Sequence, residues 1–162
     1  MRGVVPAPSK SRSAGILLHR RREQRLEVLL VHPGGPFWAR RDEGAWSIPK
    51  GEYAPDEEPL AAARREFEEE LGSAPPAGPA EDLGEVRQKG GKVVRAFALS
   101  GDFDVEQIQS NTFALEWPPR SGRTIDVPEV DRAGWFSLDE AGKKINPAQA
   151  ELLTRLAAAV SP

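Results

Sequence analysis

Acidic residues crowd into one short stretch of the sequence, REFEEELG, at residues 65–72. Like charges at neighbouring helix positions repel each other, so such a cluster costs free energy unless something offsets it. A helix has about 3.6 residues per turn, and positions three and four apart therefore share one face. In a helix, Glu66, Glu69 and Glu70 would converge on one part of the surface. The chain can tolerate this arrangement only if the three carboxylates meet a cation or are solvated.

Signals for both ends of a helix surround this stretch. Pro59 suits the first turn, where its missing N–H is not needed, and acidic residues precede it. Gly72 suits the position after the last turn, which often adopts a left-handed conformation. Leu60, Phe67 and Leu71 lie on a face that differs from the acidic one and can pack on a sheet. We therefore expect an amphipathic helix between Pro59 and Gly72.

The rest of the chain alternates short apolar runs with connections rich in glycine and proline. The 162 residues include 15 Gly and 15 Pro, which predicts long structured loops between short elements. Residues 33–46, PGGPFWARRDEGAW, form a long loop of this kind. Strand-like runs occur at residues 14–20, 26–32, 46–49, 84–88, 91–103 and 133–138, and residues 110–132 mix strand and loop. A second helix is expected over residues 146–160, capped by Asn146 with Pro147 in its first turn.

The order of these elements is strands, helix, strands, helix, in a chain short enough for a single core. This order predicts an α+β fold in which a mixed β-sheet is sandwiched between helices, an α/β/α arrangement. Residues 1–12 contain proline, serine and basic residues, and we expect them to form a flexible arm. Residues 13–162 would then form one domain.

Composition excludes several classes of protein and site. The formal net charge of -3 argues against a non-specific partner such as nucleic acid or an anionic membrane. The absence of cysteine excludes disulfides, thiolate zinc sites and cysteine nucleophiles, and it is consistent with a reducing compartment. No apolar run is long enough to span a membrane or to form the core of a signal peptide. We expect a cytoplasmic protein, a monomer or homodimer, that acts on a small molecule.

A divalent cation would explain why the chain gathers three carboxylates. Hard ions take oxygen ligands, and Mg²⁺ prefers a few carboxylates completed by water and substrate phosphates. Arg65 precedes the first of these glutamates and Glu57 lies two turns earlier, so a guanidinium fork could fix the carboxylate rotamers. Gly51 has no side chain, so its backbone could approach a ligand and offer its carbonyl. The alternative, a solvated helix held by salt bridges, leaves this spacing unexplained.

These positions also carry a resemblance to a known family. Gly51, Glu57 and residues 65–72 stand at spacings that resemble the Nudix box, the signature of Nudix hydrolases. The departure is Ser73, where the family usually has an aliphatic residue. The resemblance implies the Nudix fold and hydrolysis of a nucleoside diphosphate linked to another group X, with Mg²⁺ or Mn²⁺. It also implies roles for six residues: Gly51, Glu66, Glu69 and Glu70 as metal ligands, and Glu57 and Arg65, with Glu66 or Glu69, in catalysis.

The attacking water must lose its proton to a carboxylate, and the sequence leaves that group open. Glu66 and Glu69 in the helix are two candidates, and a residue from a distant loop is a third. Glu129 precedes Trp135 by six residues, a spacing similar to that of a late glutamate in the diadenosine tetraphosphate hydrolase branch. We expect Glu129 to be an extra metal ligand or the base, with an ordinary exposed acid as the alternative.

Several residues outside the box are candidates for contacts with substrate. The segment WSIPKGEY resembles the entry into the box in the same branch, and its Lys50 could reach a phosphate. In the long loop, Trp38, Arg40 and Arg41 would suit a phosphate clamp or lid, with a surface salt-bridge cluster as the alternative. Phe113 and Arg120 would suit base stacking and phosphate contact, although core packing is the simpler interpretation of Phe113.

The resemblance favours a dinucleoside polyphosphate, such as diadenosine tetraphosphate, as the substrate. A nucleoside triphosphate pyrophosphohydrolase of the house-cleaning type is the alternative enzyme. A Nudix-fold sensor that binds nucleotides without turning them over is an alternative of another class. Such sensors typically lose one or more box glutamates, and this chain retains all of them.

Overall fold

The computed structural model describes residues 11–160. Residues 1–10 and 161–162 lie outside the described residues, and with them most of the expected N-terminal arm. Among the described residues, the first strand begins at Arg12, the last residue of that expected arm. The elements follow in the order β1 (Arg12–Arg22), β2 (Arg25–Pro33), β3 (Lys50–Glu52), α1 (Pro59–Leu71), β4 (Ala80–Arg87), η1 (Lys89–Gly91), β5 (Val93–Ser100), η2 (Val105–Gln107), β6 (Thr112–Glu116), β7 (Thr124–Pro128), β8 (Val130–Ser137), α2 (Leu138–Lys144), η3 (Pro147–Gln149) and α3 (Ala150–Ala159).

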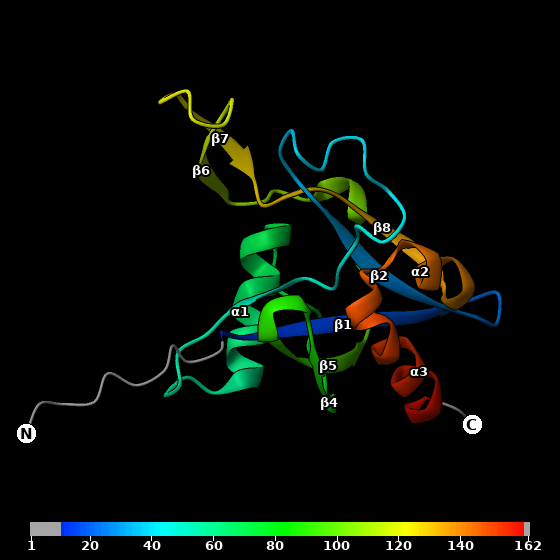
Figure 1. Ribbon diagram of the computed structural model, residues 1–162. Coiled ribbons are helices and arrows are strands. Elements are labelled where there is room, and N and C mark those ends of the chain that lie inside the picture. Colours follow the sequence, from blue (N-terminus) through cyan, green and yellow to red (C-terminus); the bar gives the residue numbers. More distant parts are fainter. Residues whose placement is uncertain (1–10, 161–162) are drawn as a thin grey trace, which may run out of the picture.

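Six strands form one mixed sheet in the order β4-β5-β1-β2-β8, and β3 also pairs with β1. β1 runs parallel to β5 and antiparallel to β2 and β3. β3 pairs with residues 13–15 of β1, and β2 pairs with residues 19–22 at its other end. β6 and β7 form a separate two-stranded hairpin, which projects from the body of the molecule (Figure 1).

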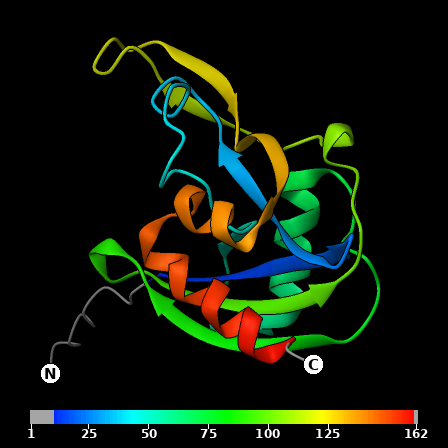
Figure 2. The same ribbon diagram turned by 90° about the vertical axis from the view of Figure 1, so that its right-hand side faces the viewer.

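Helices cover both faces of the main sheet, which confirms the expected α/β/α arrangement (Figure 2). On one face, Phe67 and Leu71 of α1 belong to a buried cluster with side chains from β1, β2 and β5. On the other face, Leu152, Leu153 and Leu156 of α3 pack into a second cluster. Consecutive side chains of β1 and β2 alternate between the two clusters, as successive residues of a strand must. Within residues 11–160 no helix is both long and apolar enough to cross a membrane.

The expected ends of α1 are confirmed. Glu58 is the N-cap, and its carboxylate accepts a hydrogen bond from the backbone N–H of Ala61. Pro59 occupies the first turn, and Gly72 follows the helix with a φ of 88°, in the left-handed region. The backbone N–H of Gly72 donates to the carbonyl of Glu68 and satisfies the last turn. The glutamates therefore sit on a helix whose register is defined at both ends.

The expected strand at residues 46–49 is wrong in its position. Trp46 and Ser47 form only isolated bridges, to Ile145 and Val31, and the regular strand β3 begins at Lys50. The backbone groups of this segment bond to several different elements, so no continuous ladder forms here.

The expected single C-terminal helix is also corrected. Asn146 caps the short 3₁₀ turn η3 through the N–H of Ala148, and the α-helix starts at Ala150. A separate helix, α2, precedes it and was not predicted. Its signals were present, since Ser137 caps it and its charges run from acidic at the start to basic at the end.

Candidate active site

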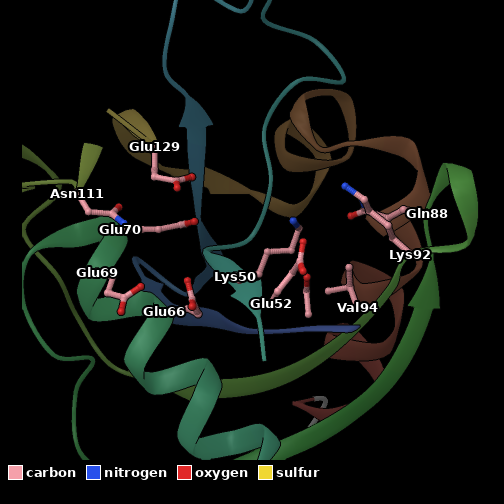
Figure 3. A pocket seen from close by; sticks show the side chains of 12 residues that line it. Lys50, Glu52, Glu66, Glu69, Glu70, Gln88, Lys92, Val94, Asn111 and Glu129 are labelled. Atoms are coloured by element: carbon pink, nitrogen blue, oxygen red, sulfur yellow. The ribbon is translucent and has the colours of Figure 1, made fainter. Parts of the chain in front are cut away.

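The acidic face of α1 forms one side of a cavity of about 420 Å³ (Figure 3). Its other sides come from β3, from the turn between β4 and β5, and from the base of the β6–β7 hairpin. Residues selected from the sequence line it together: Lys50, Gly51, Glu66, Glu69, Glu70 and Glu129. The fold thus gathers carboxylates from α1 and from a loop almost sixty positions later in the chain.

Arg65 connects the acidic residues of α1 to the segment before it. Its Nε and Nη2 donate to the two carboxylate oxygens of Glu57 at 3.0 and 3.1 Å, a bidentate pair. Its Nη1 donates to Glu66 at 2.7 Å and, more weakly, to Glu69 at 3.4 Å. The hydrogen bonds to Arg65 lower the pKa of Glu57, and those to Glu57 are the main cause that raises the pKa of Arg65. One guanidinium therefore orients three carboxylates.

Gly51 approaches Glu66 so closely that no side chain would fit between them. A Cβ added to Gly51 would lie 1.9 Å from Oε1 of Glu66 and 2.1 Å from its Cδ. The approach follows from the pairing of Gly51 with Ala14 in the sheet, beneath α1. The carboxylate of Glu66 therefore occupies the space that a side chain at residue 51 would need.

Glu70 is the carboxylate most affected by its surroundings. Burial raises its pKa to about 8, the nearby charges of Glu129 and Glu66 add to the effect, and Lys50 opposes it. Burial also raises the pKa of Glu66, with the charge of Glu69 as a further cause. Burial lowers the pKa of Lys50, which the charge of Glu70 partly offsets. The site therefore disfavours its own negative charges and would be relieved by a bound cation.

The donor atoms of this site suit a hard divalent ion. They are carboxylate oxygens and a backbone carbonyl, with no histidine or thiolate, which is the ligand class of Mg²⁺ and Mn²⁺. Among residues 11–160, no three acidic or histidine side chains are placed closely enough to hold an ion as they stand. Arg65 engages an oxygen of both Glu66 and Glu69 in this arrangement. Binding would require the side chains of Glu66 and Glu69, which are both partly exposed, to rotate.

Basic and amide side chains that the sequence did not single out line the far side of the cavity. Figure 3 shows Gln88 and Lys92 opposite Glu66, Glu69 and Glu70. They flank the KGG turn between β4 and β5, and the backbone N–H of Gln88 donates to the carbonyl of Lys92 at 2.7 Å. The basic composition of this turn was the only sequence signal for them.

Glu129 reaches the cavity from the connection between β7 and β8. Its backbone N–H donates to the carbonyl of Asn111 at 2.9 Å, and its carbonyl accepts from the N–H of Gly34 at 3.1 Å. Asn111 lines the cavity as well, and its own N–H donates to the carbonyl of Glu69 at the end of α1. The two ends of the β6–β7 hairpin are thereby attached to the acidic helix.

The remaining candidates do not line this cavity. Arg41 places its guanidinium 4.4 Å from the centre of the Phe37 ring, and Trp38 packs against the core on the α3 face. Phe113 lies in the projecting hairpin, opposite Val127, and is 39% exposed. Two further candidates, Arg40 in the long loop and Arg120 in the hairpin turn, are exposed and also lie away from the cavity lining.

The sequence matches the NUDIX domain family over residues 9–156, nearly the whole chain. No curated protein matches it. Solved structures of similar fold include an Ap4A hydrolase of C. elegans in a binary complex, with a TM-score of 0.64, 24% identity, and coverage of 93% of this chain and 97% of that one. The NUDIX domain of Shewanella oneidensis NrtR, complexed with ADP ribose, has a TM-score of 0.66, 19% identity, and coverage of 96% and 91%.

A mutT/nudix family protein from Listeria innocua is a third similar structure, with a TM-score of 0.63, 19% identity, and coverage of 96% of both chains. At these identities the structural likeness establishes the fold, whereas the family match covers the residues of the acidic site. We conclude that this chain belongs to the Nudix family of hydrolases, enzymes that cleave phosphoanhydride bonds.

Proposed function

We propose that this protein is a metal-dependent hydrolase that cleaves a phosphoanhydride bond in a nucleoside diphosphate-linked compound. The main support is that one cavity has an acidic side and a basic side. Three carboxylates of α1 face Lys92, with Lys50 between the two sides (Figure 3). A polyphosphate is complementary to both sides, because its oxygens can share a cation with the carboxylates and also accept from the lysines.

Each residue of the site has a proposed role. Glu66, Glu69 and Glu70, with the carbonyl of Gly51, would hold Mg²⁺ or Mn²⁺. When bound, this ion would neutralise phosphate charge and lower the pKa of the attacking water. The bidentate pair of Arg65 with Glu57 would keep the carboxylates in position. Lys50 would donate to a phosphate oxygen of the substrate.

Glu129 is our candidate for the carboxylate that accepts the proton of the attacking water. Its carboxylate lines the cavity and makes no hydrogen bond or salt bridge with another residue in the range 11–160. Its backbone N–H and carbonyl are both hydrogen-bonded, to Asn111 and Gly34, so the backbone that carries the side chain is fixed in position. Glu66 and Glu69 are the alternatives, but both already bond to Arg65.

We favour a dinucleoside polyphosphate as the substrate class. The similar fold of a C. elegans Ap4A hydrolase supports this choice, as does the WSIPKGEY segment, which places Lys50 in the cavity. The similar NUDIX domain of NrtR is complexed with ADP ribose, so a compound with only two phosphates is a further candidate. A nucleoside triphosphate pyrophosphohydrolase fits the same two-sided cavity. A cytoplasmic location and action without a nucleic-acid partner remain predictions.

Phosphate release from a panel of nucleotides with Mg²⁺ tests the proposal. We expect turnover of diadenosine tetraphosphate to ATP and AMP, and loss of about a hundredfold or more in kcat for Glu69→Gln and Glu70→Gln, since the ion supplies several kcal/mol. Glu68→Gln is the matched control, because Glu68 is exposed on the same helix but does not line the cavity. Tight nucleotide binding without any turnover would instead indicate a sensor.

A further inference from the structure

Gln149 is one of very few polar side chains that are completely buried among the described residues. It lies in η3, just before α3, far from the acidic helix in sequence. Its Oε1 accepts a hydrogen bond from the backbone N–H of Ile48 at 3.1 Å. Its Nε2 donates to Oγ of Ser47 at 3.0 Å and to Oε1 of Gln88 at 2.8 Å. A buried amide with all these contacts has a single favourable orientation.

This network also determines the orientation of Gln88. A backbone N–H can only donate, so Gln149 must turn its oxygen toward Ile48 and its nitrogen toward Gln88. That nitrogen can only donate as well, so Gln88 must present its oxygen to Gln149. The Nε2 of Gln88 is then not used in this network, and it makes no hydrogen bond with any residue in the described range 11–160. Gln88 therefore has two free N–H donors on Nε2, while its Oε1 is engaged by Gln149.

The position of Gln88 in the cavity indicates which ligand groups its N–H donors could bind. Gln88 and Lys92 line the cavity side by side, joined across the β4–β5 turn, and they face the carboxylates of α1 (Figure 3). Free amide N–H donors beside an ammonium group favour a ligand group that accepts hydrogen bonds, such as a phosphate oxygen. A metal held by the α1 carboxylates would engage the phosphates at the opposite side of the cavity.

We propose that Gln88 is a substrate-binding residue that donates to a phosphate beyond those engaged by the metal, and that Gln149 is its positioning residue. This proposal rests on the proposed function, because it assumes that the cavity holds a polyphosphate. Its consequence is selectivity for phosphate chain length. A chain of four phosphates should reach both sides of the cavity, whereas a chain of two should reach only the metal side.

Kinetics with substrates of different chain length test the role of Gln88. We expect Gln88→Leu to raise KM for diadenosine tetraphosphate about tenfold, the usual value of a hydrogen bond to a charged group, with little change in kcat. KM for diadenosine diphosphate should stay the same. Gln107→Leu, an exposed glutamine outside the cavity, is the matched control. Equal effects on both substrates, or none on either, would overturn the proposal.

A second variant tests Gln149 as the positioning residue. In Gln149→Glu the new carboxylate still accepts from Ile48 but cannot donate to Gln88, so the amide of Gln88 must turn its oxygen toward the cavity. We expect a KM increase for the tetraphosphate at least as large as that of Gln88→Leu. The double variant Gln88→Leu/Gln149→Glu should then be no worse than Gln149→Glu alone, whereas additive effects would show that Gln149 does not act through Gln88.

Binding measurements separate this proposal from the proposed function and from loss of folding. Calorimetry with inorganic tripolyphosphate and Mg²⁺ requires no turnover, and we expect about tenfold weaker binding for Gln88→Leu than for the unchanged protein. Equal affinities would contradict the role of Gln88 even if the protein proves to be a sensor. In case Gln149→Glu does not fold, NMR of the unchanged protein decides. Tripolyphosphate should shift the side-chain amide protons of Gln88, while those of Gln149 stay protected from exchange; unshifted Gln88 signals or rapidly exchanging Gln149 protons would contradict the proposal.

Discussion

The helix α1 and the loop at residues 33–46 both carry dense charge, but they use it in opposite ways. In α1 the carboxylates converge on one cavity, and Arg65 bonds to two of them and to Glu57 just before the helix. In the loop, Arg40 is exposed and Arg41 lies over the ring of Phe37. Dense charge indicates a site only where the backbone directs several side chains to the same point.

The loop is nevertheless held firmly by the groups beneath it. His32 is completely buried, its Nε2–H donates to the carbonyl of Arg41 at 2.6 Å, and its Nδ1 lies 2.9 Å from Asp131. Asp42 accepts from Nε1 of Trp46 at 2.8 Å and pairs with Lys144 of α2. These contacts tie the loop to the β2–β8 side of the fold, and its arginines do not line the acidic cavity.

The largest effect is expected from a substitution at Gly51, because it tests whether activity depends on the close approach of β3 to the carboxylate of Glu66 in α1. We expect Gly51→Ala to lower kcat/KM by about a hundredfold or more, since a Cβ 1.9 Å from Glu66 must displace that carboxylate. Kinetics with Mg²⁺ measure this effect. Gly142→Ala is the matched control, because a Cβ there meets nothing within 4 Å. Full activity in Gly51→Ala would show that the position of Glu66 is unimportant.

A change at Arg65 tests whether the carboxylates need an orienting partner. Arg65→Lys keeps the charge but cannot form the bidentate pair with Glu57, so we expect metal affinity to fall by about 10- to 100-fold. Titration with Mn²⁺ measures this affinity. Arg64→Lys is the matched control, because Arg64 lies on the same helix and donates to the carbonyl of Gly78, and it should leave the affinity unchanged. Similar values for both variants would contradict the orienting role.

The pKa of Glu70 makes the stability of the metal-free protein depend on pH. A folded pKa of about 8 lies above the ordinary value of 4.5, so between these values the folded state binds more protons than the unfolded state. The contribution of Glu70 to stability is thus present at low pH and lost as pH rises toward about 8. By the proposed function, Mg²⁺ would bind the ionised carboxylate, so the rise in Tm that it causes should grow over the same range.

Thermal unfolding at pH 6 and 8.5, with and without Mg²⁺, measures this effect. We expect a difference of a few degrees in the Mg²⁺-induced shift between the two pH values, about 1 kcal/mol in a domain of this size. Glu70→Gln should remove most of the pH dependence. A Mg²⁺-induced shift that is the same at both pH values would argue against a proton–metal exchange at Glu70.

The smallest effects are expected in the loop. Arg40→Ala and Arg41→Ala should each change kcat/KM by less than about threefold, because exposed charges outside the cavity contribute little. The same nucleotide assay measures them. The phosphate clamp expected from the sequence predicts a far larger loss with raised KM. Such a loss would place the loop over the bound substrate and would remove the contrast with α1.

Local patterns predicted the parts of the molecule that depend on neighbours in sequence. The bounds of α1 followed from Pro59 and Gly72, and the β1–β2 and β4–β5 hairpins followed from apolar runs around short polar turns. The α/β/α arrangement followed from the order of elements. The strand at residues 46–49 failed because its backbone bonds to several distant partners in place of one ladder. The helix α2 was missed although its cap and charge signals were present, and the C-terminal helix begins later than expected, after η3.

The sequence by itself determined the acidic face of α1, because the period of a helix is a property of the backbone and needs no tertiary contact. Only the tertiary structure decided what lies across from it. Gln88, Lys92 and Asn111 join the site through strand pairing and through bonds to residues as distant as Gln149, which is 61 positions from Gln88. Hydrogen bonds of this range leave no periodic trace in a sequence, because either partner alone is an ordinary polar residue.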